Sequence, residues 1–78
     1  MIHPSEKYQH IQDPTGKIAK DEPVFLMRCQ DVLMIPVMMV WGDLMFEKTG
    51  NSGLVEVIQK HSIVALNWQE VNGCKLPD

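Results

Sequence analysis

The sequence predicts a mainly α-helical protein, a helical hairpin with an extended N-terminal arm that associates with copies of itself. Two long apolar segments flank the short polar stretch "TGNSG" at positions 49–53, which is typical of a tight turn between helices. The first 23 residues are polar and punctuated by proline and glycine. The chain has 78 residues of which 45% are hydrophobic, more apolar surface than one small hairpin can bury.

The N-terminal arm spans residues 1–23, and a helical-hairpin oligomerisation domain spans residues 24–78. Within the arm, "DPTG" at positions 13–16 places Asp, Pro and Gly where a type I turn prefers them. Such an arm is either mobile or lies across another surface. The apolar stretch after Pro23 is a strand or the start of a helix, because a run this short fits both. A lone strand has no partner in the chain, so we expect an extended segment that packs on the helices or pairs with a second subunit.

The first helix of the hairpin is expected over residues 36–48. Asp31 is a candidate N-cap for a preceding helical turn over residues 32–35, and Pro36 suits a first helical turn. Gly50 suits the left-handed position that ends a helix. Gly42 weakens the helix by about 1 kcal/mol relative to alanine, unless close packing requires it.

The second helix is expected over residues 53–71, with Ser52 as the N-cap and Gly73 at its end. At helical spacing, one apolar stripe runs along it. Its members are Leu54, Val57, Ile58, His61, Ala65 and Trp68.

The first helix is apolar on almost every side, from Met34 to Phe46. A helix of this kind is normally buried on every side, and a two-helix hairpin cannot achieve that alone. The sequence therefore predicts a homo-oligomer, most simply a symmetric dimer. In the alternative, the N-terminal arm folds back and covers the excess apolar surface.

Composition excludes several classes of protein. The net charge of −3 argues against a nucleic-acid binder. No apolar run approaches the roughly 20 residues of a membrane span, and the N-terminus lacks the features of a signal peptide. We therefore expect a cytoplasmic location with reduced Cys29 and Cys74, and a Cys29–Cys74 disulfide is the alternative. No spacing of histidines and cysteines suggests a metal, and no nucleophile–base pattern suggests an enzyme. We expect no cofactor.

Candidate ligand-binding residues combine cations with aromatic rings. Arg28 ends an apolar run, and its planar fork suits a phosphate or carboxylate. In the alternative, Arg28 is held in an ion pair by a nearby carboxylate. An aromatic ring can stack on a nucleotide base. The full set of candidates is Tyr8, Lys17, Lys20, Arg28, Gln30, Asp31, His61 and Trp68.

Residues 17–78 resemble a group of short phage- or prophage-encoded proteins. The pattern is acid-Pro-Val-Phe, two apolar residues, Arg, a small residue, Gln and Asp, followed by a Trp helix and a His/Trp helix that ends near Pro-Asp. The matching positions are Glu22, Pro23, Val24, Phe25, Arg28, Gln30, Asp31, Trp41, His61, Trp68, Pro77 and Asp78. The chain departs from the pattern in its methionine-rich run at 32–47.

This resemblance implies a counter-defence protein that acts by stoichiometric binding in the cytoplasm of an infected bacterium. We expect it to sequester a cyclic nucleotide or an ADP-ribose-type immune signal at its subunit junctions. Two alternatives stay open. One is inhibition of a host defence protein through an acidic surface that includes Asp43, Glu47 and Glu56, and the other is a structural or assembly role.

Overall fold

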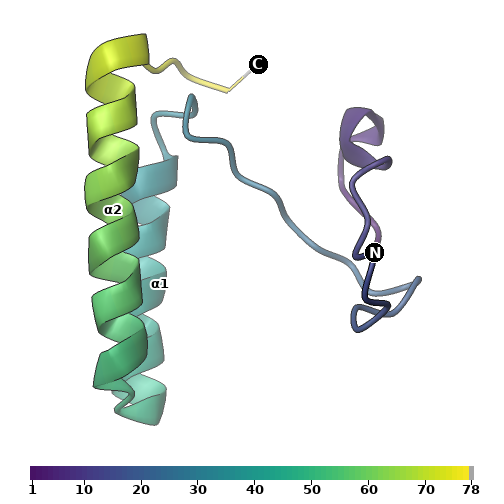
Figure 1. The fold of residues 1–78 in the computed structure, drawn as a ribbon, viewed down its shortest axis with the longest axis horizontal. Helices are drawn as coiled ribbons and strands as arrows, with labels where there is room; N and C mark the ends of the chain where they lie inside the picture. The colour runs from purple at the N-terminus through teal and green to yellow at the C-terminus, as the bar shows by residue number, and fades with distance from the viewer. Residues whose placement is uncertain (78) are drawn as a thin grey trace.

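A computed structural model describes residues 1–77 and shows two antiparallel helices packed side by side (Figure 1). The helices are α1 (Met34–Thr49) and α2 (Ser52–Asn72), and a single 3-10 turn, η1 (Glu6–Tyr8), lies near the N-terminus. Within residues 1–77 the extended backbone forms only two isolated bridges and no strand. The predicted mainly α-helical hairpin is confirmed.

Helix α1 begins two residues earlier than predicted and ends one residue later. Its first turn holds Pro36, and Gly50 ends it in the left-handed conformation at φ 65°, donating its N–H to the carbonyl of Phe46 at 2.8 Å. Asp31 does not cap α1 directly, because the N-cap position belongs to Leu33. Instead the Asp31 carboxylate accepts the N–H of Leu33 at 2.8 Å, in the turn that leads into the helix.

Helix α2 begins at the residue that the sequence predicted as its cap. The N-cap is Asn51 rather than Ser52, and its side-chain oxygen accepts the N–H of Leu54 at 3.0 Å. Either residue type can make this bond, and the length of the turn after Gly50 decides between them. Gly73 follows the helix at φ 78°, as predicted.

Small residues let the two helices approach closely. Gly42 of α1 and Ala65 of α2 are the buried positions of the hairpin. Around them the contacts come from half-buried methionines, Ile58 and Ser62, and the Ser62 hydroxyl lies 3.4 Å from the sulfur of Met39. No large side chain within residues 1–77 is fully buried. The hairpin therefore has a thin seam between its helices and hardly any core.

The apolar stripe predicted on α2 divides into two. Leu54, Ile58 and Ala65 lie on the side of α1, whereas Val57 and Trp68 are 57% and 43% exposed and His61 is exposed too. Each residue of a helix is rotated by about 100° from the last, so Val57 and Ile58 do not share one narrow face. The single face proposed from the sequence is therefore wrong.

The N-terminal segment folds back on itself rather than running straight. Ile2 donates its N–H to the carbonyl of Glu22 and accepts the N–H of Val24, both at 2.9 Å, so the chain closes a loop. Inside the loop the buried His3 meets the carbonyl of Ile11 through Nε2 at 2.7 Å. The predicted turn at 13–16 is present, with the N–H of Gly16 on the carbonyl of Asp13 at 3.2 Å. We call residues 1–24 the N-terminal loop. Its η1 turn does not pack against α1 or α2.

Candidate functional site

A cavity of about 300 Å³ lies where the N-terminal loop, the extended segment 25–31 and the C-terminal tail meet. We call it the Arg28 cavity. Its polar lining consists of Ser5, Lys7, Tyr8, Arg28, Gln30, Asp31 and Lys75. Phe25, Leu26 and Met27 add apolar walls. The cavity thus joins three parts of the chain that are far apart in sequence.

Backbone pairing between the extended segment and the tail builds one wall of the Arg28 cavity. Lys75 donates its N–H to the carbonyl of Gln30 at 2.8 Å and accepts the N–H of Val32 at 2.9 Å. Gln69 on α2 fixes the same segment by donating its side-chain amide to the carbonyl of Cys29 at 2.9 Å. These bonds anchor the backbone that directly follows Arg28 to α2 and to the C-terminal tail.

Cys29 also anchors this segment. Its thiol donates to the carbonyl of Ala65 at 3.3 Å, at the buried position of α2. Cys29 and Cys74 are both free thiols. The cysteine side chain therefore points at the helix while its neighbour Arg28 lines the cavity.

Among residues 1–77, the charged groups that line the Arg28 cavity are three cations, Lys7, Arg28 and Lys75, and one carboxylate, Asp31. One oxygen of Asp31 already accepts the N–H of Leu33. Arg28 is exposed and forms no ion pair within residues 1–77, where the single ion pair joins Lys60 to Glu56 at 3.0 Å. The ion-pair alternative for Arg28 is therefore not observed in this part of the chain. Among residues 1–77 the lining of the cavity contains more cationic than anionic side chains, whereas the net charge of the chain is −3.

An aromatic ring lies among these cations. Tyr8 is half-buried, and the Nζ of Lys7 lies 5.2 Å from the centre of its ring. The imidazole of His3 meets the same ring edge-on, with 6.5 Å between ring centres and 62° between planes. These contacts orient Tyr8 from the loop side, and its ring also lines the cavity.

Four of the eight predicted site residues line the Arg28 cavity: Tyr8, Arg28, Gln30 and Asp31. The other four are elsewhere in the chain. Lys17 and Lys20 lie on the N-terminal loop, where the N–H of Lys17 binds Asp13 and the carbonyl of Lys20 accepts the terminal ammonium of Met1 at 2.9 Å. His61 and Trp68 are exposed on α2.

Two cations of the cavity, Lys7 and Lys75, were not predicted from the sequence. Lys7 adjoins Tyr8, and an aromatic next to a lysine is a weak local signal for such a site. Lys75 carries no local signal, because its position depends on backbone pairing with residues 45 positions earlier in the chain.

A second hollow has a different character. It has a volume of about 390 Å³ on the outer side of α1, between Pro36, Val37, Val40, Trp41 and Leu44. These side chains offer no hydrogen-bonding group apart from the indole N–H of Trp41. This hollow suits contact with an apolar partner surface rather than binding of a polar ligand.

Residues 1–77 contain no group of three histidine, cysteine or acidic side chains arranged to hold a metal ion. In the same part of the chain, neither helix combines the length and apolar character needed to cross a membrane. Comparison with known protein families, curated proteins and solved structures finds no match to this chain.

Proposed function

We propose that this protein is a non-enzymatic binding protein that sequesters a small nucleotide signal in the Arg28 cavity. The observation that carries the proposal is the exposed Arg28 guanidinium, which has no ion-pair partner within residues 1–77 and lines one cavity with Lys7, Lys75 and the Tyr8 ring. Guanidinium groups bind phosphate oxygens through two parallel hydrogen bonds, and aromatic rings stack on bases.

The size of the cavity limits the ligand. About 300 Å³ is at the lower end of the range for small-molecule sites, roughly 300–1,000 Å³. One nucleoside phosphate unit of a cyclic nucleotide or an ADP-ribose-type signal fits this range. A larger signal would extend beyond the cavity, toward a second subunit if the protein is a homo-oligomer. Gln30 and the free oxygen of Asp31 are available for the polar edge of a base or a ribose hydroxyl.

The proposed biological setting follows from the resemblance to phage-encoded proteins. In the cytoplasm of an infected bacterium, a homo-oligomer that binds an immune nucleotide at every subunit would lower the free concentration of that signal. Such a role needs stoichiometric amounts of protein and no turnover.

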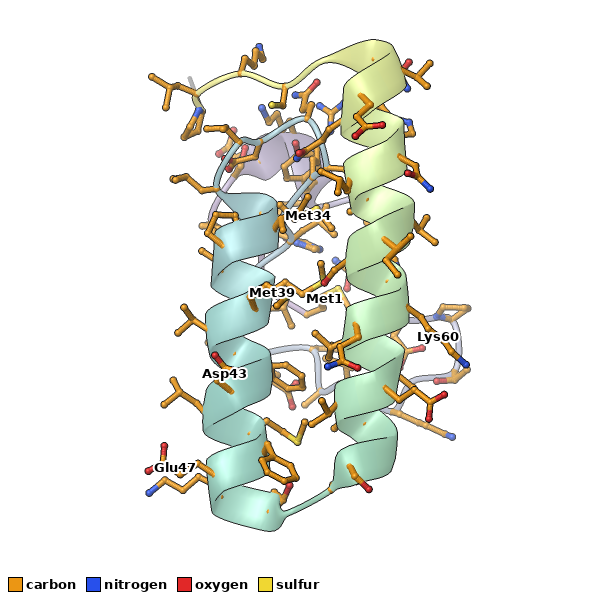
Figure 2. All side chains as sticks on the ribbon, turned by 90° about the vertical axis from the view of Figure 1, so that its left-hand side faces the viewer. Met1, Met34, Met39, Asp43, Glu47 and Lys60 are labelled. Carbon is orange, nitrogen blue, oxygen red and sulfur yellow. The ribbon has the colours of Figure 1, made fainter. Side chains whose placement is uncertain are left out.

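Inhibition of a host defence protein is the second candidate, and one observation favours it. Asp43 and Glu47 are exposed, lie one helical turn apart on α1, and point away from α2 (Figure 2). Neither carboxylate forms an ion pair in the described part of the chain. An acidic edge of this kind suits a basic surface of a partner protein.

Binding to a panel of cyclic mononucleotides, cyclic dinucleotides and ADP-ribose tests the proposal, measured by native mass spectrometry and titration calorimetry. We expect at least one ligand to bind, and Arg28→Ala to weaken it about 10- to 100-fold, the effect of losing a charge-assisted hydrogen bond. Arg28→Lys should lose less. Lys48→Ala removes an exposed cation on α1 outside the Arg28 cavity and should bind normally.

Two results would contradict the proposal: no ligand of the panel binds, or Arg28→Ala binds as tightly as the wild type. In either case, pull-downs from bacterial lysate with the wild type and with Asp43→Lys/Glu47→Lys test the second candidate. A partner that is lost only with the charge-reversed protein would support inhibition of a host protein.

A further inference from the structure

One face of the helical hairpin carries two apolar stripes that no part of residues 1–77 covers. The stripe on α1 consists of Val37, Val40, Trp41 and Leu44, which are 48%, 57%, 50% and 54% exposed. The stripe on α2 consists of Val57, Val64, Trp68 and Val71, with His61 among them, and its apolar members are 43–84% exposed. We call the two stripes together the open face.

The α2 stripe has the spacing of a coiled-coil seam. Positions 57, 61, 64, 68 and 71 are separated by alternating steps of four and three residues, which keeps them on one side of a helix. The seam that α2 uses inside the hairpin, at Ile58, Ser62 and Ala65, has the same spacing and lies about 100° away. Helix α2 therefore carries two packing seams, and only one of them is occupied.

The α2 stripe and, on α1, Val37 and Trp41 lie on the same side of the hairpin, whereas Val40 and Leu44 lie toward the outer side of α1. Met39 of α1 touches Ser62 of α2 on the opposite side, which faces the viewer in Figure 2. Helical rotation places Val37 and Trp41 about 160° from Met39, and places Val64 about 160° from Ser62. The open face is therefore the far side in Figure 2, where the N-terminal loop lies behind the helices.

The N-terminal loop does not cover the open face. It stands away from the helices (Figure 1), and its η1 turn packs against neither of them. The connecting segment is exposed too: Phe25 is 74% and Leu26 is 39% exposed. Residues 25–27 form no backbone hydrogen bond within the described chain. Residues 1–77 therefore leave the apolar side chains of the open face exposed.

We propose that a second copy of this chain covers the open face, with the open faces of two hairpins packed together as a four-helix bundle. Each N-terminal loop then lies along the outside of the partner's hairpin. None of the residues that make up the two stripes is an aspartate, glutamate, lysine or arginine. A twofold axis through the open face therefore brings apolar surface against apolar surface.

The area of the open face fits a stable dimer. The eight apolar side chains of the open face are 43–84% exposed and offer roughly 700 Å² per subunit, close to the roughly 800 Å² per partner of standard interfaces. The need for a partner is equally clear, because Ala65 is the one buried apolar side chain of residues 1–77. Packing of the second seam would supply the core that the single hairpin lacks.

Two adjacent residues give a matched test. Val64 and Ile63 are both β-branched and are 61% and 60% exposed. Val64 belongs to the open face, whereas Ile63 lies about 100° away around α2 and outside that face. At about 100 µM, where an interface of standard size is saturated, light scattering and native mass spectrometry of the wild type should give twice the chain mass of 8.9 kDa. Ile63→Glu should keep that mass, and Val64→Glu should give monomers.

Tryptophan fluorescence of the wild type provides a second readout that needs no variant. Both tryptophans of the chain, Trp41 and Trp68, belong to the open face. We expect blue-shifted emission that resists quenching by acrylamide, and a red shift on dilution that follows the loss of dimer mass. This measurement holds even if Val64→Glu does not fold.

A wild-type monomer at this concentration would overturn the proposal, as would equal effects of the two glutamate variants or fully quenchable tryptophans in an intact dimer. The experiment contains no nucleotide, so its result does not depend on the ligand proposed for the Arg28 cavity. Conversely, Arg28→Ala should leave the dimer mass unchanged, because Arg28 lies outside the open face.

Discussion

Gly42 of α1 lies against Ile58 of α2 so closely that a Cβ atom added to Gly42 would be 3.2 Å from Cγ2 of Ile58. From the sequence, this glycine weakens the helix unless close packing requires it. The structure shows that close packing: Gly42 is buried and Ile58 lies directly against it. The rotation of both helices about their axes depends on this contact, and so does the choice of which apolar residues remain exposed.

Replacement of Gly42 by a large side chain should destabilise the hairpin. We expect Gly42→Leu to lower the free energy of unfolding by about 1–3 kcal/mol, despite leucine's better helix propensity, because the new side chain overpacks the seam. Urea denaturation followed by circular dichroism measures the change. Asp43→Leu, one residue on and exposed, is the matched control and should not destabilise. Equal effects would mean that the close contact is unimportant.

The cap of α2 should contribute measurably to stability. Asn51→Ala removes the acceptor of the Leu54 N–H and should cost about 1 kcal/mol in unfolding free energy. Asn67→Ala, at an exposed position inside the same helix, should be neutral or slightly stabilising because alanine has the higher helix propensity. Thermal or urea denaturation compares the two variants. A neutral Asn51→Ala would show that Ser52 takes over the cap, as the sequence analysis expected.

The side chain of Gln69 should hold the extended segment on α2. Gln69→Leu removes its hydrogen bond to the carbonyl of Cys29, which should cost about 1 kcal/mol and speed amide exchange at Val32 and Lys75. Hydrogen exchange followed by NMR gives both rates. Gln59→Leu places the same change at an exposed position of α2 and should leave them unaltered. Unchanged exchange in Gln69→Leu would show that the backbone pairing with Lys75 is sufficient.

Acid should loosen the turn of the N-terminal loop. The Thr15 hydroxyl, followed by the N–H groups of Thr15, Ile18 and Lys17, lowers the pKa of Asp13 from its ordinary 3.8 to about 2. Because the folded pKa is the lower one, the stabilisation is complete above pH 3.8 and is lost as the pH falls toward about 2. Amide chemical shifts of Thr15 and Ile18 should follow this titration. They should lose it in Asp13→Asn and keep it in Asp43→Asn.

The local signals in the sequence were sufficient for the helices and their ends. Gly50 and Gly73 occupy the positive-φ positions predicted for them, since few other residues adopt that conformation without strain. The cap of α2 was misplaced by one residue because Asn51 and Ser52 are both good caps and only the length of the turn separates them.

The candidate site was predictable in part. Arg28, Gln30 and Asp31 are neighbours in sequence, so a cavity that includes one of them readily includes the others. Tyr8, Lys7 and Lys75 join them through the folding of the N-terminal loop and the pairing of the tail. Each of these depends on a few long-range backbone hydrogen bonds. No spacing rule in a sequence reports such bonds.

By itself, the sequence determined a hairpin of two helices with too much apolar surface for its size, because helix propensity, caps and turns act between near neighbours. The tertiary structure alone decided which side of each helix is buried. With apolar residues on almost every side of α1, periodicity favours no face. In the structure two small residues, Gly42 and Ala65, are buried at the seam between the helices. This packing leaves Trp41, Val64 and Trp68 exposed together on one face.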